Sequence, residues 1–261
     1  MRFAFSTLGC PGASLDHVLE LAKGNDISGL ELRTATDEFT NTTLSTPARR
    51  ELRTRIEDAG LEILAVSSYV KLCAVEEQPL EAHLELAADL GARGVRVFPG
   101  DVDGGTTDGP SAGEIRALDR VTSAPRDAQI LLETHDSHSA GRKMAALLTL
   151  LDNDVPGHNV KVIWDSAHTW SHGETPAEAF ELLKPWIEFV QIKDSDSSQD
   201  YRPVAMGAGD YPIRDLLQVL DGTDYPLSLE WELKWHPHLP PLEEALPATR
   251  AWLDQGAADV R

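Results

Sequence analysis

Short apolar segments alternate with longer amphipathic segments along the whole chain. The short segments are rich in β-branched residues, which predicts strands that are buried on both faces. The longer segments between them are expected to be helices. The expected strands cover residues 3–7, 29–33, 62–69, 95–98, 130–135, 162–168, 189–195 and 227–232, and the expected helices cover residues 14–24, 47–59, 79–91, 111–124, 138–151, 176–185, 213–220 and 242–254.

Residues typical of helix ends support this alternation. Ser14 can cap the first expected helix, and Thr46 and Thr175 each precede a proline at a favoured first helical position. Gly60 and Gly91 stand where helix ends are expected. The helix count is therefore supported by local chemistry as well as by hydrophobic patterning.

Repeated strand-then-helix units predict a parallel sheet with right-handed crossovers. The length of 261 residues is close to the roughly 250 residues of a (β/α)8 barrel. An open doubly wound sheet is the alternative, but residues 8–12 lack the G-x-G-x-x-G spacing that a dinucleotide-binding fold would place after its first strand. No linker, repeat or low-complexity segment divides the chain. We predict an α/β fold, a (β/α)8 TIM barrel, as a single domain over residues 1–261.

Each of the last four expected strands turns polar near its C-terminal end, at Glu133, Asp165, Gln191 and Glu230. In a closed parallel barrel these ends meet at one mouth, so four oxygen-bearing side chains could surround one divalent cation. Such a hard ligand set favours Mn²⁺, with Mg²⁺ next and Zn²⁺ less suited. Taken singly, each residue could equally be a helix cap or an ion-pair partner. The four in succession predict a metal-dependent enzyme.

The neighbours of these residues leave some roles open. Strand alternation puts Glu232 on the same side as Glu230, so periodicity does not choose between them as a ligand. Lys193, Asp194 and Glu232 could be ion-paired supports.

Two histidines adjoin the expected ligands. His135 lies two residues after Glu133, and His168 lies three residues after Asp165. Either could act on substrate protons, although a histidine near a strand end is often only a structural hydrogen-bonding residue.

Composition narrows the class of function. A formal net charge of −20 opposes binding to nucleic acid and to anionic membranes. No apolar stretch approaches the roughly 18 residues of a membrane span, and the N-terminal segment reads as a first strand instead of a secretion signal. With only Cys10 and Cys73 present, a disulfide framework is not expected, so a cytoplasmic location is predicted.

The segments GLELR, ETHDSH, WDSAHTW followed by HGETP, FVQIKDS, MGAGDYP and LSLEWELKWHP resemble, in order, the xylose isomerase-like TIM-barrel family of sugar phosphate isomerases and epimerases. The resemblance implies a divalent cation held at the ends of strands five to eight by Glu133, Asp165, position 191 and Glu230. It thereby favours Glu230 over Glu232.

Two departures from the family pattern bear on the substrate. Position 191 is Gln where the family usually has His, although some dehydratases of the family also carry Gln there. Ketohexose 3-epimerases of the family carry a further Glu and Arg at positions that correspond here to Ser139 and Ser197. Ketohexose epimerisation is therefore not expected.

The leading hypothesis is a sugar or sugar phosphate isomerase or epimerase that moves a proton next to a carbonyl through a metal-stabilised enediolate. The resemblance implies that Glu133 and Glu230 act as base and acid, and His168 would hold or protonate a substrate oxygen. The expected substrate contacts, each following a strand, are Arg33, Lys193 and Lys234.

A dehydratase of a cyclic keto-polyol or 3-dehydroshikimate-like acid is the first alternative, with His135 removing the α-proton. A non-catalytic sugar-binding barrel is the second. A DNA-repair endonuclease of related fold would require a basic surface that this acidic chain lacks. The expected partner is a small carbohydrate or polyol, and a homo-oligomer remains open.

Overall fold

The computed structural model describes residues 2–101 and 109–259, and it contains a closed barrel of eight parallel strands. Every barrel strand pairs with its neighbours in chain order, and the last pairs with the first, as expected for a TIM barrel. The barrel strands are β1 (Phe3–Ser6), β2 (Gly29–Arg33), β3 (Glu62–Lys71), β4 (Val95–Phe98), β5 (Ile130–Glu133), β6 (Val160–Asp165), β7 (Ile187–Ile192) and β10 (Leu227–Leu229). The predicted fold class is confirmed.

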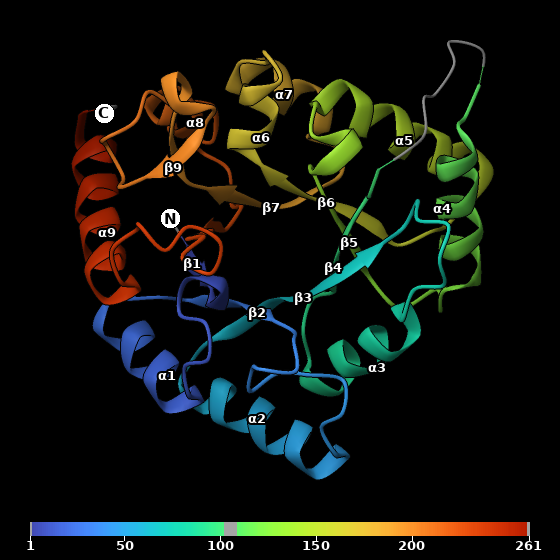
Figure 1. Cartoon of the computed structure of the whole chain (residues 1–261), viewed down its shortest axis with the longest axis horizontal. Coiled ribbons are helices and arrows are strands. Elements are labelled where there is room, and N and C mark those ends of the chain that lie inside the picture. Colours follow the sequence, from blue (N-terminus) through green and yellow to red (C-terminus); the bar gives the residue numbers. More distant parts are fainter. Residues whose placement is uncertain (1, 102–108, 260–261) are drawn as a thin grey trace.

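Helices surround the strands, and the chain travels once around the ring, so that the C-terminal helix lies beside the first helix (Figure 1). Each expected helix is present within a few residues of its predicted bounds. These helices are α1 (Leu15–Gly24), α2 (Thr46–Asp58), α3 (Leu80–Leu90), α4 (Ala112–Ser123), α5 (Gly141–Asp154), α7 (Pro176–Leu183), α8 (Ile213–Val219) and α9 (Leu242–Asp259).

The expected strands at 130–135, 162–168, 189–195 and 227–232 end earlier than predicted, because the chain turns into other structure at the mouth. The added elements are the 3-10 helices η1 (Thr7–Gly9), η2 (Asp136–His138) and η3 (Ser197–Gln199), the short helix α6 (Ser166–Ser171), and an antiparallel hairpin of β8 (Asp194–Asp196) and β9 (Arg202–Val204). Glu230 and Glu232 both follow the last residue of β10. Strand alternation therefore does not govern their orientation.

Most of the expected helix caps are present. Ser14 accepts a hydrogen bond from His17 N, and Thr175 forms a reciprocal capping box with Glu178. In α2 the cap is Ser45 and not Thr46, which is already helical.

Two hydrophobic layers hold the barrel together. A small cluster fills the barrel itself, and its members are Ala4, Leu64, Ala65, Leu131, Ile163 and Phe189. The larger cluster lies between the strands and the helix ring. Leu131, for example, belongs to the inner cluster, whereas its neighbours Ile130 and Leu132 belong to the outer one. The barrel strands are thus buried on both faces over most of their length, as their apolar sequences predict.

An ionic network closes the N-terminal end of the barrel. Arg93, just before β4, lies 2.6 Å from Glu62 of β3 and 2.9 Å from Glu188 of β7. Gln129 donates a hydrogen bond to Glu188 at 3.0 Å, and Arg2 lies 3.3 Å from Glu62. Arg93 therefore joins strands from two sides of the barrel floor.

We expect Arg93→Met to lower the free energy of unfolding by about 1–2 kcal/mol, because it leaves two half-buried carboxylates without their shared cation. Arg53→Met is the matched control, since Arg53 pairs with exposed Glu57 one helical turn away, and it should cost under about 0.5 kcal/mol. Urea denaturation measures both. Equal effects would show that the floor network contributes no more than an ordinary surface pair.

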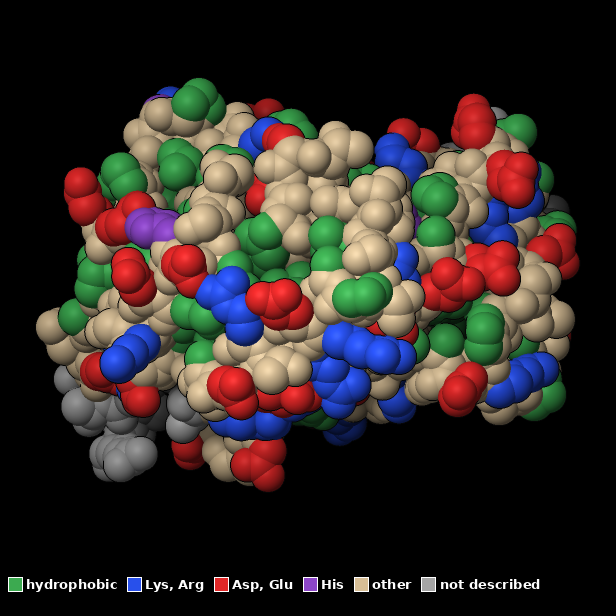
Figure 2. Space-filling view, turned by 90° about the horizontal axis from the view of Figure 1, so that it is seen from below, with side chains coloured by type: hydrophobic (Ala, Val, Ile, Leu, Met, Phe, Trp, Pro, Cys, Tyr) green, Lys and Arg blue, Asp and Glu red, His purple; other side chains and the backbone are tan. Residues whose placement is uncertain are grey.

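Acidic and basic side chains are interspersed on the face formed by α1, α2 and α3 (Figure 2). Arg49 of α2 lies 2.9 Å from Asp89 of α3, and Arg55 of α2 pairs with Asp16 of α1. On this face the excess of negative charge is thus partly offset by pairs between neighbouring helices. Among the described residues, no helix is both long and apolar enough to cross a membrane.

Both cysteines are free and buried. Burial raises the pKa of each thiol to about 12, with Glu38 adding to the effect at Cys10 and Glu114 at Cys73.

A thiol reagent that attacks thiolates should therefore react very slowly with the native protein at pH 8 and rapidly with two thiols per chain in denaturant. Rapid native labelling would contradict the burial of both side chains.

Candidate functional site

Glu133, Asp165 and Glu230 come together at the C-terminal mouth of the barrel. Their exposed fractions are only 1%, 0% and 5%, and one oxygen from each lies within 4.8 Å of the others. Gln191 of β7 pairs in register with Asp165 of β6 on one side and with Ser228 of β10 on the other. The side chains predicted as metal ligands are thus contributed by adjacent strands.

Two buried cations compensate part of this negative charge. The ammonium of Lys193 lies 2.6 Å from Asp165 Oδ2 and 2.7 Å from Glu230 Oε2, and it also pairs with Glu232. Arg96 of β4 lies 3.2 Å from Glu133 and 3.8 Å from Glu230. Lys193 therefore pairs with three carboxylates at the mouth, those of Asp165, Glu230 and Glu232.

These contacts shift the pKa values of the cluster in opposite directions. Burial raises the pKa of Asp165 and of Glu230, only partly opposed by Lys193. Burial would lower the pKa of Lys193, but Asp165, Glu230 and Glu232 outweigh it and hold that pKa well above its usual value. For Glu232, burial is outweighed by Lys193 and His236, so its pKa is lowered. Glu232 thus acts as an ion-paired support, a role that the sequence had left open.

Glu31 is a buried carboxylate that the sequence prediction had missed. It is fully buried in β2, where it accepts hydrogen bonds from Ser228 Oγ and, at 2.9 Å, from the side-chain amide of Gln191. Burial, together with nearby Glu230, raises the pKa of Glu31 to about 8. Because the Gln191 amide nitrogen faces Glu31, its carbonyl oxygen is free for another partner.

Unpartnered oxygens in the cluster fit a cation. Glu133 Oε1 and Gln191 Oε1 are buried without a hydrogen-bond partner, which is costly unless another group satisfies them. Glu133, His135 and His168 form a second group of close ligand atoms. Lys193 lies 3.4 Å from His168 Nε2 in this group, and closer still to Asp165 and Glu230 in the first group.

Each of the two histidines next to the cluster is held by a hydrogen bond at its Nδ1. His135 Nδ1 lies 2.7 Å from Asp136 Oδ1, and His168 Nδ1 lies 2.8 Å from the Thr134 carbonyl oxygen. Their rings are 4.8 Å apart. Burial, helped by Lys193 and His135, lowers the pKa of His168 to about 4, so this imidazole is neutral at neutral pH.

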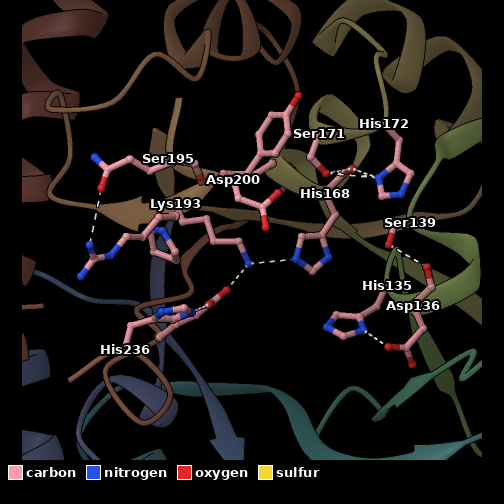
Figure 3. Close-up of a pocket in the computed structure, with 16 residues that line it drawn as sticks. His135, Asp136, Ser139, His168, Ser171, His172, Lys193, Ser195, Asp200 and His236 are labelled. Carbon is pink, nitrogen blue, oxygen red and sulfur yellow. Dashed lines mark hydrogen bonds and ion pairs between the residues drawn. The ribbon is translucent and has the colours of Figure 1, made fainter. Parts of the chain in front are cut away.

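A cavity of about 780 Å³ opens beside these rings. Figure 3 shows His135, His168 and Lys193 facing it from different elements, with His236 on a further side. The lining residues are His135, Asp136, Ser139, Ala167, His168, Ser171, His172, Lys193, Ser195, Gln199, Asp200, Tyr201, Arg202, Pro203, Glu232 and His236. Imidazoles therefore contribute more of its wall than the cluster carboxylates do.

The three expected substrate contacts lie in different places. Lys193 lines the cavity. Arg33 is buried, pairs with Glu38 and donates to the Tyr69 hydroxyl at 2.8 Å. Lys234 pairs with Asp37 at 2.8 Å. Neither of these two is among the lining residues of the cavity.

Comparison with known proteins gives the chain its family. The sequence model of the protein family described as xylose isomerase-like TIM barrel matches residues 19–256. The chain belongs to this family. A 3-dehydroshikimate dehydratase of Bacillus anthracis is 27% identical over 245 residues, covering 84% of this chain and 85% of that protein.

Solved structures of other proteins share the barrel. The probable 3-DHS dehydratase AsbF of Bacillus anthracis superposes with a TM-score of 0.77 at 21% identity, covering 97% of this chain and 99% of that one. An L-ribulose 3-epimerase superposes with a TM-score of 0.76 at 16% identity, covering 100% and 95% of the two chains. At such identities these likenesses show the fold alone.

Arg96, Glu31 and Asp136 were missed by the sequence prediction, although two of them left a signal. Arg96 interrupts the apolar strand VRVF, and Glu31 interrupts GLELR. A charged residue at the centre of a strand that is buried on both faces must point to a partner inside the barrel. Asp136 left no such signal, because its contact with His135 forms at a turn that follows the end of β5.

Removing the Lys193 ammonium should destabilise the metal-free protein strongly. In Lys193→Met the acidic partners lose their shared cation, and we expect a loss of about 3–5 kcal/mol in the presence of a chelator. Lys234→Met is the matched control and should lose less than about 1 kcal/mol, since its partner Asp37 is exposed. If denaturation midpoints of both variants match the wild type, the cluster does not need this cation.

Proposed function

We propose that this protein is a divalent-metal-dependent dehydratase that removes water from a cyclic keto-polyol acid of the 3-dehydroshikimate type. The observation that carries the proposal is the pair of imidazoles, His135 and His168, at the wall of the cavity next to the carboxylate cluster. The curated relative named 3-dehydroshikimate dehydratase, 27% identical over most of both chains, supports the same reaction class.

Glu133, Asp165, Glu230 and the side-chain oxygen of Gln191 would hold the cation. All four are oxygen donors, and unpartnered oxygens of Glu133 and Gln191 already lie buried there, so Mn²⁺ or Mg²⁺ suits the set better than Zn²⁺. When bound, the cation would act as a Lewis acid that favours negative charge on a substrate ketone oxygen.

His135 is the group that we assign as the base. With Nδ1 engaged by Asp136, its Nε2 is the nitrogen available to remove a proton next to the ketone. The electron pair of the broken C–H bond moves towards the ketone and then expels the hydroxyl on the next carbon. Protonated His135 can return its proton to that departing hydroxyl on the same face, so that one residue balances the loss of water.

Three other groups at the wall could contact such a substrate. Lys193 can donate to a substrate oxygen, and Nε2 of neutral His168 could then accept from a substrate hydroxyl in place of Lys193, which lies 3.4 Å away. Arg202 of β9 also lines the cavity and contacts His238 and Gln199. Since Arg202 has no acidic partner among the described residues, its guanidinium suits a substrate carboxylate.

A sugar isomerase or epimerase is the second candidate. It is favoured by the approach of Glu133 and Glu230 from different strands to within 4.8 Å, as a pair of acid and base would require. Two observations weigh against it as the leading function. Both carboxylates face buried cations, Arg96 and Lys193, and neither lines the cavity.

One experiment separates the two reactions. Chelator-treated protein is incubated with 3-dehydroshikimate or with keto-sugars in deuterated water, with and without Mn²⁺. For the dehydratase we expect a conjugated, ultraviolet-absorbing product that has lost the mass of water, formed only with metal. Deuterium gained at one carbon without loss of water would select the isomerase or epimerase instead.

Variants link the reaction to the site. His135→Asn should lower kcat by about 10²–10⁴-fold, whereas His17→Asn, at a partly exposed helix position paired with Glu243, should not. Mn²⁺ should raise the thermal midpoint of the wild type but not that of Asp165→Asn. Dehydration that persists in His135→Asn would remove His135 as the base.

A further inference from the structure

We propose that Asp136 is a positioning residue that fixes His135 in the tautomer with its proton on Nδ1, so that the lone pair on Nε2 faces the cavity. The inference rests on the proposed role of His135 as the base. It concerns a residue that touches neither the carboxylate cluster nor the carbon atom that would react.

Hydrogen bonding at the Asp136 carboxylate determines which nitrogen of His135 carries the proton. Oδ1 lies 2.7 Å from His135 Nδ1, and Oδ2 accepts a hydrogen bond from Gly100 N at 3.1 Å. An ionised carboxylate has only acceptor sites. The short contact with Nδ1 therefore requires that Nδ1 donates, and in the neutral ring Nε2 is then unprotonated.

The ring of His135 is fixed from other directions as well. It packs against Phe98 with centroids 4.3 Å apart, and against His168 at 4.8 Å. In the part of the chain that the structure describes, Nε2 has no hydrogen-bond partner. Asp136 and the two rings thus leave one functional atom of His135 open to the cavity, as Figure 3 illustrates.

The backbone shows that this contact is maintained at a cost. Asp136 has a φ of +48°, in the left-handed region that few residues other than glycine, asparagine and aspartate adopt. A second bond, from Ser137 Oγ to the Gly100 carbonyl at 2.6 Å, ties the same turn to the loop after β4. A carboxylate directly following its histidine in sequence can turn back to Nδ1 because of this conformation, and strained backbone of this kind is concentrated at functional sites.

Asp136→Asn tests the proposal, because asparagine tolerates the same backbone but offers an acceptor on one side only. The Gly100 N–H requires the side-chain oxygen, so the amide NH₂ would face His135 Nδ1. Nδ1 must then accept, which moves the proton of the neutral ring to Nε2. The variant is expected to fold like the wild type and to carry the wrong tautomer.

Nitrogen-15 NMR of imidazole-labelled, metal-free protein at pH 8 reports the tautomer directly. The His135 signals are assigned by their loss in His135→Asn. We expect an Nδ1–H imidazole in the wild type and an Nε2–H imidazole in Asp136→Asn. Asp196→Asn is the control, since Asp196 caps η3 outside the cavity lining and its replacement should leave the His135 spectrum unchanged.

Kinetics supply the second readout. Asp136→Asn should lower kcat by about 10²–10⁴-fold with little change in KM, as expected for a base that carries its proton on the wrong nitrogen. An Nε2–H signal in the wild type overturns the proposal even if the variant fails to fold, and so does an unchanged kcat in a variant whose tautomer has switched. If no substrate turns over in any protein, the proposed function fails, whereas the NMR result still decides the role of Asp136.

Discussion

Compensation of buried negative charge is the constraint on which the mouth of this barrel depends. Glu31, Glu133, Asp165 and Glu230 are each no more than 5% exposed, and Lys193 and Arg96 are the two cations buried against them. Glu232 also pairs with Lys193, so five carboxylates share two cations, and negative charge is in excess when all are ionised. Burying uncompensated charge is far more costly than burying a pair. The cluster can respond by binding protons, as the raised pKa of Glu31 indicates, or by binding a dication, which would offset part of the excess.

The barrel brings these charges together because of its closure. Asp165, Gln191 and Ser228 occupy one row across β6, β7 and β10, and Glu230 follows two residues beyond Ser228. Below them the inner cluster around Leu131 and Phe189 excludes water. The apolar layer makes each interaction of the mouth stronger and each unpaired group more costly. A stable barrel core and a charged, reactive mouth thus have the same structural origin.

The alternation of apolar and amphipathic segments predicted the barrel. The polar residues near its last four strand ends, Glu133, Asp165, Gln191 and Glu230, predicted that these side chains meet, because parallel strands in a closed sheet must end at one mouth. Their roles as ligands remain proposals. What the sequence could not predict depends on distance in the chain or on backbone turns. The contact of Gln191 with Glu31 joins residues 160 positions apart, and no local pattern reports it. Asp136 lies beyond the end of β5 with a φ of +48°, so strand alternation does not predict where its side chain lies.

The glutamine at position 191 affects which groups of the site can transfer protons. A histidine ligand would bring a ring nitrogen to the cluster, whereas Gln191 donates to Glu31 and leaves a neutral oxygen there. Glutamine cannot titrate in the physiological range, so proton transfer must be carried out by other groups. The cluster carboxylates face Lys193 and Arg96, and Lys193 itself is held charged by its acidic partners. His168 is neutral and accepts from Lys193, and its Nδ1 lies against a backbone carbonyl oxygen. Of the two imidazoles next to the cluster, His135 is the one whose Nε2 has no partner among the described residues, and its proposed role as the base rests on this.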